Sequence, residues 1–508
     1  MLAGLLVPAL GAARAQTPIS YMLYDPLPSP DAEFGRDVHV ADLDGDGDSE
    51  LIVGAPGKMV GAAERAGVLD IKVGPIDGLP GNHGWISITE PVLGLASGPR
   101  QWDQFGFRVV SADFNADGYT DLAVSAPGVY HDQARFGSPP QGHWEQGSVF
   151  ILFGPWRFDR AIPYAAAAEV VEDVLHRNND FNDSRTLFPD RFGWRIAAGD
   201  ANADGAADLV VGSPYSEVTD GGVHYYNQVG EAYLYFGPAL ASWITLELPA
   251  THNDPSGSYP SLTDRLWGWD VGCGNITGSG QDEVVVAAYS AENPIGPIYV
   301  PNAGWVRVFS DYSSVPPSGF ARVFDIRRPA GDVINMSFGW SLAVGRYDGD
   351  GYDDLVVGAP FDGLDPLRGE VNVFSGGASF PAQSFAFDRG AAPGQSMDKF
   401  GLDVCVLDDQ DGDGLAELVI GAPFFSDGSG LVQRQGPGRV FTRHSQTGSQ
   451  DGIDDPSPEI IRGERYGWGS ALCAGRLDGN AALDLVIGNP RATRLGLAKA
   501  GEIRIVVH

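Results

Sequence analysis

The sequence contains little cysteine and little positive charge. Its 508 residues include three cysteines, Cys273, Cys405 and Cys473, which are too few for a disulfide framework. Lysine and arginine number 33 against 66 aspartate and glutamate residues, so the formal net charge is -33. This balance disfavours binding to nucleic acid or to an anionic membrane surface, because both require a basic patch. It is compatible with bound metal cations.

Long apolar runs are also scarce. After residue 15 no stretch approaches the roughly 20 apolar residues that a membrane-spanning helix needs, so we expect no membrane span. Residues 1–15, MLAGLLVPALGAARA, end in Ala13-Arg14-Ala15 and are typical of a secretory signal peptide, although a basic start is missing. The sequence therefore predicts export to the extracellular space, the cell surface or the periplasm.

A repeated segment organises the rest of the chain. Its first copy, residues 34–56, reads FGRDVHVADLDGDGDSELIVGAP: an aromatic-glycine start, an acidic loop and an apolar run that ends in Gly-Ala-Pro. Further copies begin at residues 105, 192, 267, 338, 400 and 468. A repeat of this length along a whole chain is typical of propellers and solenoids.

Each copy reads as a set of short β-strands. Two strands flank the acidic loop, a third follows as in GSVFILF at 147–153, and a weaker fourth follows as in WITLEL at 243–248. Four strands in each of seven units predict an all-β fold, a seven-bladed β-propeller. The seventh copy ends at its third strand, so we expect residues 19–24 to supply the fourth strand and close the ring.

This interpretation makes residues 16–508 one domain. Its predicted blades are residues 31–98, 99–188, 189–261, 262–332, 333–394, 395–462, and 463–508 together with 17–30.

The acidic loop is the candidate metal site. In the first copy Asp42, Asp44 and Asp46 are each separated by one residue, and Glu50 follows. Carboxylates this close repel one another, and oxygen ligands at this spacing suit Ca²⁺. An EF-hand would need a glutamate at loop position twelve, but Val53 stands there within a strand-like run. Carboxylates that only cap turns are a weaker explanation for several well-formed copies than for a single loop.

The combined motif resembles a known family. Phe-Gly, then an Asp-rich loop, then Asp-Leu-Val-Val-Gly-Ala-Pro resembles the FG-GAP repeats of integrin α-subunit head domains. Similar repeats occur in bacterial secreted proteins and in a glycosylphosphatidylinositol-specific phospholipase D. The resemblance covers about the whole chain after residue 15. It implies a seven-bladed propeller with Ca²⁺ in the loops that join first and second strands, and partner-binding loops on the opposite face.

If the family pattern holds, loop positions one, three, five and nine supply side-chain oxygens and position seven a backbone carbonyl. Four loops fit, so we expect about four Ca²⁺ sites. Their candidate ligands are Asp42, Asp44, Asp46, Asp48, Glu50, Asp113, Asn115, Asp117, Tyr119, Asp121, Asp200, Asn202, Asp204, Ala206, Asp208, Asp409, Asp411, Asp413, Leu415 and Glu417. Position six is Gly47, Gly118, Gly205 or Gly414, where a sharp turn favours positive φ.

The other three loops depart from the pattern. The fourth has Asn275, Thr277, Ser279 and Glu283 at its four ligand positions, so only one of them is a carboxylate and it is predicted to bind no ion. The fifth and seventh have Arg346 and Arg476 at position one, where a guanidinium can neutralise the loop as an internal cation. The fifth loop retains weaker metal candidates, Asp348, Asp350 and Asp354.

Aromatic residues gather in the connections from second to third strands, on the face opposite the acidic loops. The candidate ligand-binding residues there are Tyr130, His131, Trp144, Tyr225, Tyr226 and Tyr299. Exposed aromatic side chains on loops are typical of protein or carbohydrate recognition. Packing among themselves explains them equally well.

No catalytic motif is present in the sequence: the GxSxG elbow, HExxH, a Walker loop and a dinucleotide fingerprint are all missing. We therefore predict a secreted, non-enzymatic, Ca²⁺-binding protein for extracellular recognition or cell adhesion, with a protein or carbohydrate ligand and structural Ca²⁺. The alternative is a polysaccharide lyase or hydrolase with its site at the central channel, because residues from different blades leave no local motif.

Overall fold

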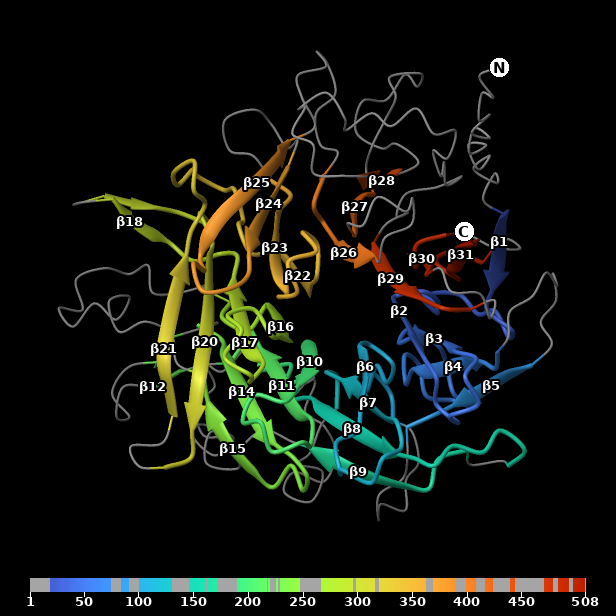
Figure 1. Ribbon diagram of the computed structural model, residues 1–508. Coiled ribbons are helices and arrows are strands. Elements are labelled where there is room, and N and C mark those ends of the chain that lie inside the picture. Colours follow the sequence, from blue (N-terminus) through green and yellow to red (C-terminus); the bar gives the residue numbers. More distant parts are fainter. Residues whose placement is uncertain are drawn as a thin grey trace, which may run out of the picture.

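The computed structural model describes a chain built of β-strands and loops (Figure 1). The described residues are 19–74, 84–90, 100–129, 146–160, 163–170, 190–216, 218–219, 225–226, 229–246, 266–295, 298–315, 319–361, 369–388, 399–407, 416–423, 439–443, 470–477, 483–492 and 497–507. The predicted signal peptide, residues 1–15, lies outside them. Within these ranges there is no helix with the length and apolar character needed to cross a bilayer.

Six sheets have four antiparallel strands each. Listed by sheet, they are β2 (Asp37–Ala41), β3 (Glu50–Ala55), β4 (Val68–Lys72) and β5 (Trp85–Ile88); β6 (Val109–Ala112), β7 (Asp121–Ala126), β8 (Ser148–Phe153) and β9 (Ala166–Val170); β10 (Arg195–Gly199), β11 (Asp208–Ser213), β14 (Glu231–Phe236) and β15 (Ser242–Thr245); β16 (Asp270–Gly274), β17 (Glu283–Ala288), β20 (Trp305–Ser313) and β21 (Gly319–Ile326); β22 (Ser341–Gly345), β23 (Asp354–Ala359), β24 (Glu370–Ser375) and β25 (Ala382–Asp388); and β29 (Ala471–Gly475), β30 (Asp484–Asn489), β31 (Glu502–Val507) and β1 (Ile19–Tyr24).

The remaining described strands form smaller sheets. The sixth repeat gives a three-stranded sheet, β26 (Val404–Leu407), β27 (Glu417–Ala422) and β28 (Arg439–Arg443). Two loops fold into hairpins, β12 (Val218–Thr219) with β13 (Tyr225–Tyr226), and β18 (Asn293–Ile295) with β19 (Ile298–Val300).

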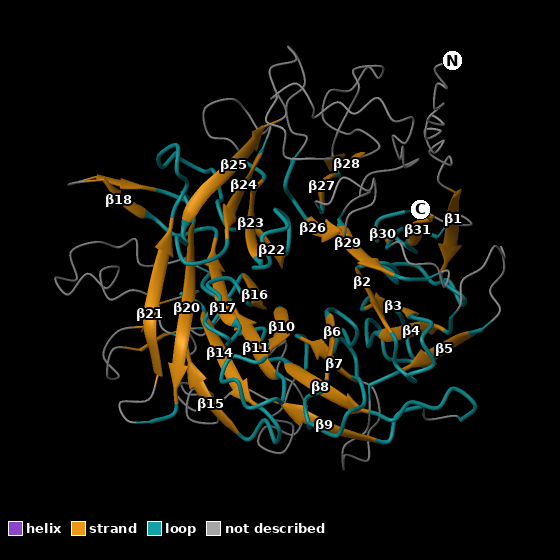
Figure 2. Cartoon of the chain, in the orientation of Figure 1, coloured by secondary structure: helices purple, strands orange, loops and turns teal. Residues whose placement is uncertain are grey.

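The sheets are arranged around a common axis as a β-propeller (Figure 2). The first strand of each repeat is innermost, and neighbouring inner strands contact one another in the order β2, β6, β10, β16, β22, β26, β29 and back to β2. The ring is therefore closed on itself.

The number of complete blades corrects the prediction from sequence. We predicted seven four-stranded blades, but the described residues form six, and the sheet of the sixth repeat has three strands. The apolar pattern after β28 is weaker than in the other repeats, and residues 444–469 lie outside the described ranges.

The N-terminal strand pairs with the last strand of the chain. β1 lies antiparallel to β31, from Ile19 opposite Val507 to Tyr24 opposite Glu502. The predicted pairing of residues 19–24 is therefore confirmed. It satisfies the backbone groups of β31 that would otherwise form an open sheet edge.

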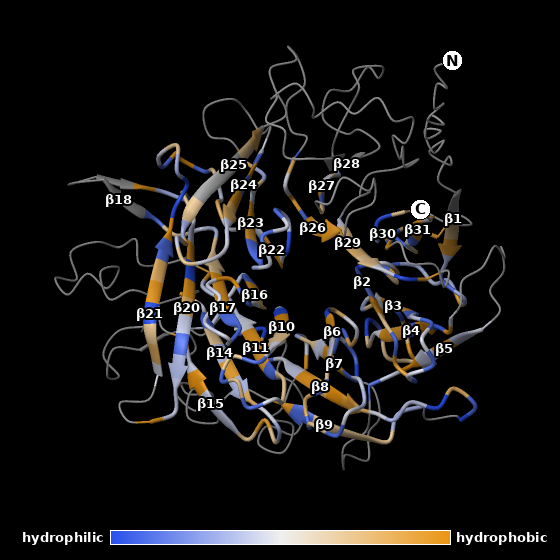
Figure 3. Ribbon diagram, viewed as in Figure 1, coloured by the Kyte–Doolittle hydropathy of each residue, from blue (hydrophilic) through white to orange (hydrophobic). Residues whose placement is uncertain are grey.

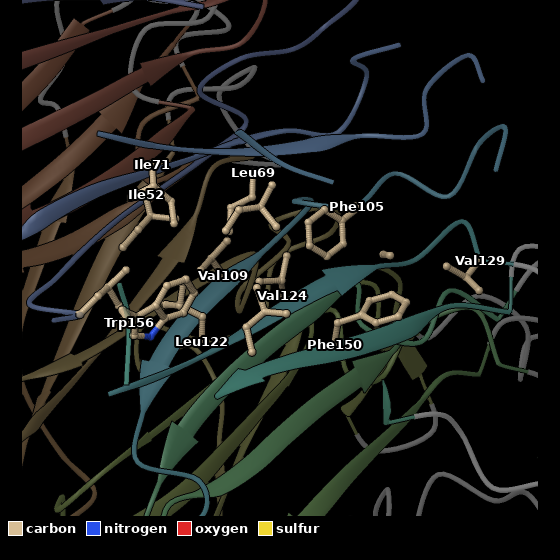
Figure 4. Close-up of a cluster of buried hydrophobic side chains, with 14 residues drawn as sticks. Ile52, Leu69, Ile71, Phe105, Val109, Leu122, Val124, Val129, Phe150 and Trp156 are labelled. Atoms are coloured by element: carbon tan, nitrogen blue, oxygen red, sulfur yellow. The ribbon is translucent and has the colours of Figure 1, made fainter. Parts of the chain in front are cut away.

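The core lies between adjacent blades. Figure 4 shows one such cluster, in which Ile52 and Leu69 of the first sheet meet Leu122, Val124 and Phe150 of the second. Figure 3 shows the apolar residues concentrated on strands such as β8. Each pair of neighbouring sheets thus buries one face of each, which is how a propeller forms a core without any single large one.

The aromatic-glycine pair explains how the blades approach so closely. Phe105 is fully buried and stacks edge-on against Phe150, with ring centroids 5.8 Å apart. Gly106 follows with φ +84, and a Cβ there would lie 2.7 Å from the carbonyl oxygen of Val68 in the preceding blade. A phenylalanine that fills the core and a glycine that admits the neighbouring backbone are therefore both required by the packing.

Candidate functional site

The three acidic loops of the first three repeats share one hydrogen-bonding pattern. The position-one carboxylate accepts the position-six N–H: Gly47 to Asp42 (3.0 Å), Gly118 to Asp113 (2.8 Å) and Gly205 to Asp200 (3.0 Å). The side chains at positions three and five likewise accept the N–H two residues later in each loop. The same local conformation is therefore built three times.

Positions four and six of these loops have left-handed backbone. Gly47, Gly118 and Gly205 have φ of 97, 85 and 90, so the predicted positive φ at position six is confirmed for them. Gly414 lies outside the described residues. Position four is Gly45 in the first loop but alanine in the next two, with φ 58 and 57. These alanines store backbone strain of about 1–2 kcal/mol each, which the surrounding contacts must offset.

The position-nine carboxylates are buried and anchored at both oxygens. Asp121 accepts the N–H of Phe114 (3.0 Å) and of Gly154 (2.8 Å), and Asp208 accepts those of Ala201 and Gly237 (both 2.9 Å). Burial raises the pKa of Asp121 to about 6 and of Asp208 to about 7, although these hydrogen bonds oppose the shift. The carboxylate therefore joins the acidic loop to the end of the third strand.

In the first loop the carboxylates converge. Asp42, Asp44 and Glu50 each place a carboxylate oxygen within 4.8 Å of the others. Glu50 also accepts the N–H of Leu43 (2.9 Å), and burial raises its pKa to about 7. Oxygen ligands lie about 2.3–2.6 Å from a bound Ca²⁺ ion. Two oxygens on opposite sides of one ion are therefore about as far apart as the 4.8 Å seen here, so these carboxylates can share one ion. The donor set, three carboxylates on a tight turn, fits a hard divalent cation.

The sixth loop is described only at its end. Asp409, Asp411, Asp413 and Leu415 lie outside the described residues, and Glu417 is buried at the start of β27. Its occupancy by Ca²⁺ stays a prediction.

The fourth loop satisfies its position-nine carboxylate with hydrogen bonds from the protein. Glu283 accepts hydrogen bonds from the N–H and hydroxyl of Thr277 (2.8 and 2.6 Å), from Ser279 (3.0 Å) and from Ser310 (2.8 Å). Arg322 donates to Thr277 Oγ1 (3.0 Å) and so places a guanidinium beside this network. Hydroxyl groups here occupy the roles that carboxylates hold in the first three loops.

The fifth loop differs from the arrangement that its sequence suggested. Arg346 is largely exposed, and its Nε lies 3.8 Å from Asp353 rather than beside Asp348 and Asp350. Asp348 instead accepts a hydrogen bond from Ser375 (2.8 Å). The hypothesis of an internal cation at position one is therefore wrong for Arg346. Arg476 belongs to a loop of which residues 478–482 lie outside the described ranges.

Neighbouring acidic loops are joined by backbone hydrogen bonds. Ala207 N–H donates to Asp113 O, Asp282 N–H to Asp200 O, and Asp353 N–H to Asn275 O, each at 3.0 Å. The Asp282 side chain also accepts the N–H of Asp200 (2.9 Å). The first residue of each of these loops is thus held by the loop of the next blade.

The opposite face carries a continuous series of aromatic rings. These residues come from the starts of the inner strands and the ends of the second strands, and we call them the aromatic arc: Phe107, Trp194, Tyr215, Trp269, Tyr289, Trp340 and Phe361. Successive ring centroids from Phe107 to Trp194, Trp269 and Trp340 are 4.9, 5.3 and 4.9 Å apart. Trp194 and Trp340 are half-buried, so part of the arc remains accessible.

The four inner-strand rings, Phe107, Trp194, Trp269 and Trp340, were not among the ligand-binding residues predicted from sequence. The signal was present: aligned copies place these rings directly after the glycine of the aromatic-glycine pair. Of the predicted ligand-binding residues, Tyr130, His131 and Trp144 lie outside the described part of the chain. Tyr225 and Tyr226 lie in β13 and Tyr299 in β19, where the structure places the backbone.

A charged residue stands two positions after the glycine of the aromatic-glycine pair in most repeats, at the start of the inner strand. Asp37, Asp270 and Asp403 each accept an N–H of the next blade's inner strand, from Val109 (2.8 Å), Leu342 (2.9 Å) and Leu472 (2.8 Å) respectively. Arg108 and Arg195 hold the same position in the second and third blades; Arg108 donates to Asp37 Oδ1 (2.8 Å), and Arg195 Nε lies 3.4 Å from Asp270 Oδ1. Charges near the axis therefore join successive blades.

A family model described as FG-GAP repeat matches residues 34–69, 105–142, 192–226, 338–378 and 400–441. The chain is 27% identical over 431 residues to phosphatidylinositol-glycan-specific phospholipase D of Homo sapiens, covering 82% of this chain and 46% of that protein. It is 33% identical over 166 residues to integrin alpha-7 of Rattus norvegicus, covering 32% of this chain and 13% of that protein.

Among solved structures, BBS1N in complex with ARL6DN, soaked with lead, matches with a TM-score of 0.44 and 12% identity, covering 96% of this chain and 95% of that one. The chain spans less than half the length of the two curated relatives. The five matches to the family model and the similarity to the integrin lead to one conclusion. The chain contains FG-GAP repeats and is homologous to the N-terminal propeller regions of integrin α chains.

Proposed function

We propose that this propeller is an extracellular recognition module whose acidic loops bind structural Ca²⁺ and whose aromatic face binds the ligand. The convergence of Asp42, Asp44 and Glu50 within 4.8 Å supports the ion, and the repeated hydrogen-bonding pattern extends it to the second and third loops. An ion that binds only the folded chain stabilises it, by about 2.7 kcal/mol per site at a hundredfold excess over Kd.

Calorimetric titration of the metal-free chain with Ca²⁺ tests the metal sites. We expect about four ions to bind, and EDTA to lower the melting temperature. Asp44→Ala should remove one ion from the stoichiometry because it deletes a carboxylate from the first loop. Ser279→Ala in the fourth loop is the matched control and should leave the stoichiometry unchanged. An identical melt with and without EDTA would reject structural Ca²⁺.

Recognition is supported by the aromatic arc, because half-buried tryptophans at a protein surface are typical of binding sites for protein or carbohydrate. A carbohydrate and protein array probed with the full chain would identify the ligand. Trp340→Ala should abolish the strongest signal, whereas Tyr119→Ala, an exposed aromatic in the second acidic loop, should not. Equal signals for both variants would place binding elsewhere.

Cell adhesion, as the name integrin suggests for one set of relatives, is one form that such recognition could take. The other relative is named as a phospholipase that acts on phosphatidylinositol-glycan, so hydrolysis is the second candidate. Three aspartates near the axis favour binding over catalysis, namely Asp37, Asp270 and Asp403. Each already accepts a hydrogen bond from a backbone N–H of the next blade. Product release from a polysaccharide or a phosphatidylinositol-glycan by the purified chain would instead support an enzyme.

A further inference from the structure

Three arginines from successive blades gather beside one end of the aromatic arc. Arg36 precedes β2, Arg108 precedes β6, and Arg195 begins β10. The guanidinium carbons of Arg36 and Arg108 lie 4.8 and 5.6 Å from the ring centroid of Phe107. Phe107 in turn packs against Trp194. Phe107 and Arg108 are buried and Arg36 and Trp194 are half-buried, so Arg36 and Trp194 are the accessible members of this series of contacts.

These arginines have more hydrogen-bond donors than acceptors to receive them. The Nε atoms of Arg36, Arg108 and Arg195 are all buried and have no hydrogen-bond partner among the described residues. Arg108 and Arg195 have carboxylate neighbours, but Arg36 forms no ion pair within the described part of the chain. A buried N–H without a partner costs free energy, and a bound oxyanion would recover it.

The nearby carboxylates of Asp37 and Asp270 accept hydrogen bonds from groups other than Arg36. Asp37 uses one oxygen for Arg108 and the other for the N–H of Val109. The two carboxylate oxygens of Asp270 accept hydrogen bonds from the N–H groups of Val271 and Leu342. Burial and the neighbouring Arg108 lower the pKa of Arg36 to about 9, although Glu33 and Asp37 oppose the shift. Among the described residues, Arg36 is therefore the one of these three arginines with no carboxylate at ion-pair distance.

We propose that Arg36, with Arg108, binds the carboxylate of an acidic sugar whose ring packs on the aromatic arc. A guanidinium recognises a carboxylate through two parallel N–H···O bonds, and the half-buried ring of Trp194 provides the apolar contact for a sugar ring. The net charge of -33 opposes long polyanions and acidic protein surfaces, so a short ligand with a single carboxylate fits best. This inference rests on the proposed function and specifies its ligand class.

Calorimetric titration of the full chain with D-glucuronate, and with D-glucose as the neutral match, tests the proposal. We expect glucuronate to bind at least tenfold more tightly than glucose, since a charge-assisted pair contributes about that much. Arg36→Gln should remove this preference, and Arg36→Lys, which keeps the charge but loses the fork, should weaken it partially. Arg346→Gln, an exposed arginine on the acidic-loop face, is the matched control and should bind like the parent chain.

Melting curves of each variant establish that the fold is kept. Equal affinity for glucuronate and glucose, or unchanged preference in a folded Arg36→Gln variant, would overturn the inference. If Trp340→Ala abolishes binding of an array ligand while Arg36→Gln does not, the proposed recognition stands and the carboxylate assignment falls. Tighter binding of an acetylated peptide with a C-terminal glutamate than of glucuronate would also overturn the sugar and assign the arginines to peptide.

Discussion

Lys58 is enclosed by two carboxylates in the outer part of the first blade. Its Nζ lies 2.6 Å from Asp25 and 2.9 Å from Asp70, and all three side chains are buried. Lys58→Met would leave two buried carboxylates without a counter-charge. We expect the free energy of unfolding to fall by about 3–5 kcal/mol, measured by urea denaturation.

Lys499→Met is the matched control, because Lys499 lies 3.6 Å from Asp31 with both side chains about half exposed. Its effect should stay within about 1 kcal/mol. A loss of similar size in both variants would contradict a buried triad at Lys58.

Asp403 should make stability depend on pH. Burial raises its pKa to about 7 from an ordinary value of 3.8, although Arg195 and Arg108 oppose the shift. Between roughly pH 4 and pH 7 the folded chain therefore holds a proton that the unfolded chain has released, so this contribution to stability is lost as pH rises.

Asp403→Asn keeps an oxygen for the N–H of Leu472 but cannot titrate. The free energy of unfolding of the parent chain should decrease from pH 4 to pH 7 at constant Ca²⁺. In the variant this decrease should be smaller by about 1–3 kcal/mol. Asp159→Asn, on an exposed loop, is the control and should follow the parent curve. Parallel curves for all three chains would refute the role of Asp403.

Among the elements, β1 is the strand that comes from the far end of the chain to complete a blade. Leu23 is 4% exposed and packs with Phe34 of the first repeat and Ile503 of β31. We expect Leu23→Ala to destabilise the chain by about 2–4 kcal/mol, because it leaves a cavity where the first and last blades meet.

The same substitution four residues later serves as its control. Leu27 is 70% exposed, so Leu27→Ala should change the free energy of unfolding by less than about 0.5 kcal/mol. A chain that lacks residues 17–30 should lose cooperative unfolding. Retention of a single sharp transition in that chain would show that β1 is dispensable.

The strands adjoining the acidic loops could be predicted from sequence because each carries its own signal. The apolar run after the loop became β3, β7, β11, β17, β23, β27 and β30 in turn, and every described residue that we expected at loop position nine begins such a strand. The number of complete blades was less secure, since a weak outer strand has no motif and its pairing depends on distant neighbours.

The site was predictable only where a contact is local. The loop geometry follows from residues within nine positions of one another, so sequence spacing captured it. The aromatic arc joins Trp194, Trp269 and Trp340, each from a different blade, so no local pattern reveals it. The excess of donors at Arg36 depends likewise on what the neighbouring blade already provides to Asp37.

At the scale of the whole molecule, the two faces differ in the chemical groups that they present. The acidic loops bring carboxylates together on tight turns, whereas the other face presents rings and cations. Because the sheets pack only against their neighbours, the stability of the ring is close to a sum over adjacent blades. Loss of an ion should therefore weaken the nearest interfaces first and leave the aromatic arc intact until the ring opens.

The hydrogen bonds from Ala207 to Asp113, Asp282 to Asp200 and Asp353 to Asn275 make the loops a linked series. An ion that orders the first residue of one loop also fixes the segment by which the next blade holds it, so the second ion has less chain entropy to overcome. The fourth loop, tied by its hydroxyl groups around Glu283, would act as a permanently ordered member of the series. The second and third loops would then take up calcium cooperatively, with a Hill coefficient above one for this pair.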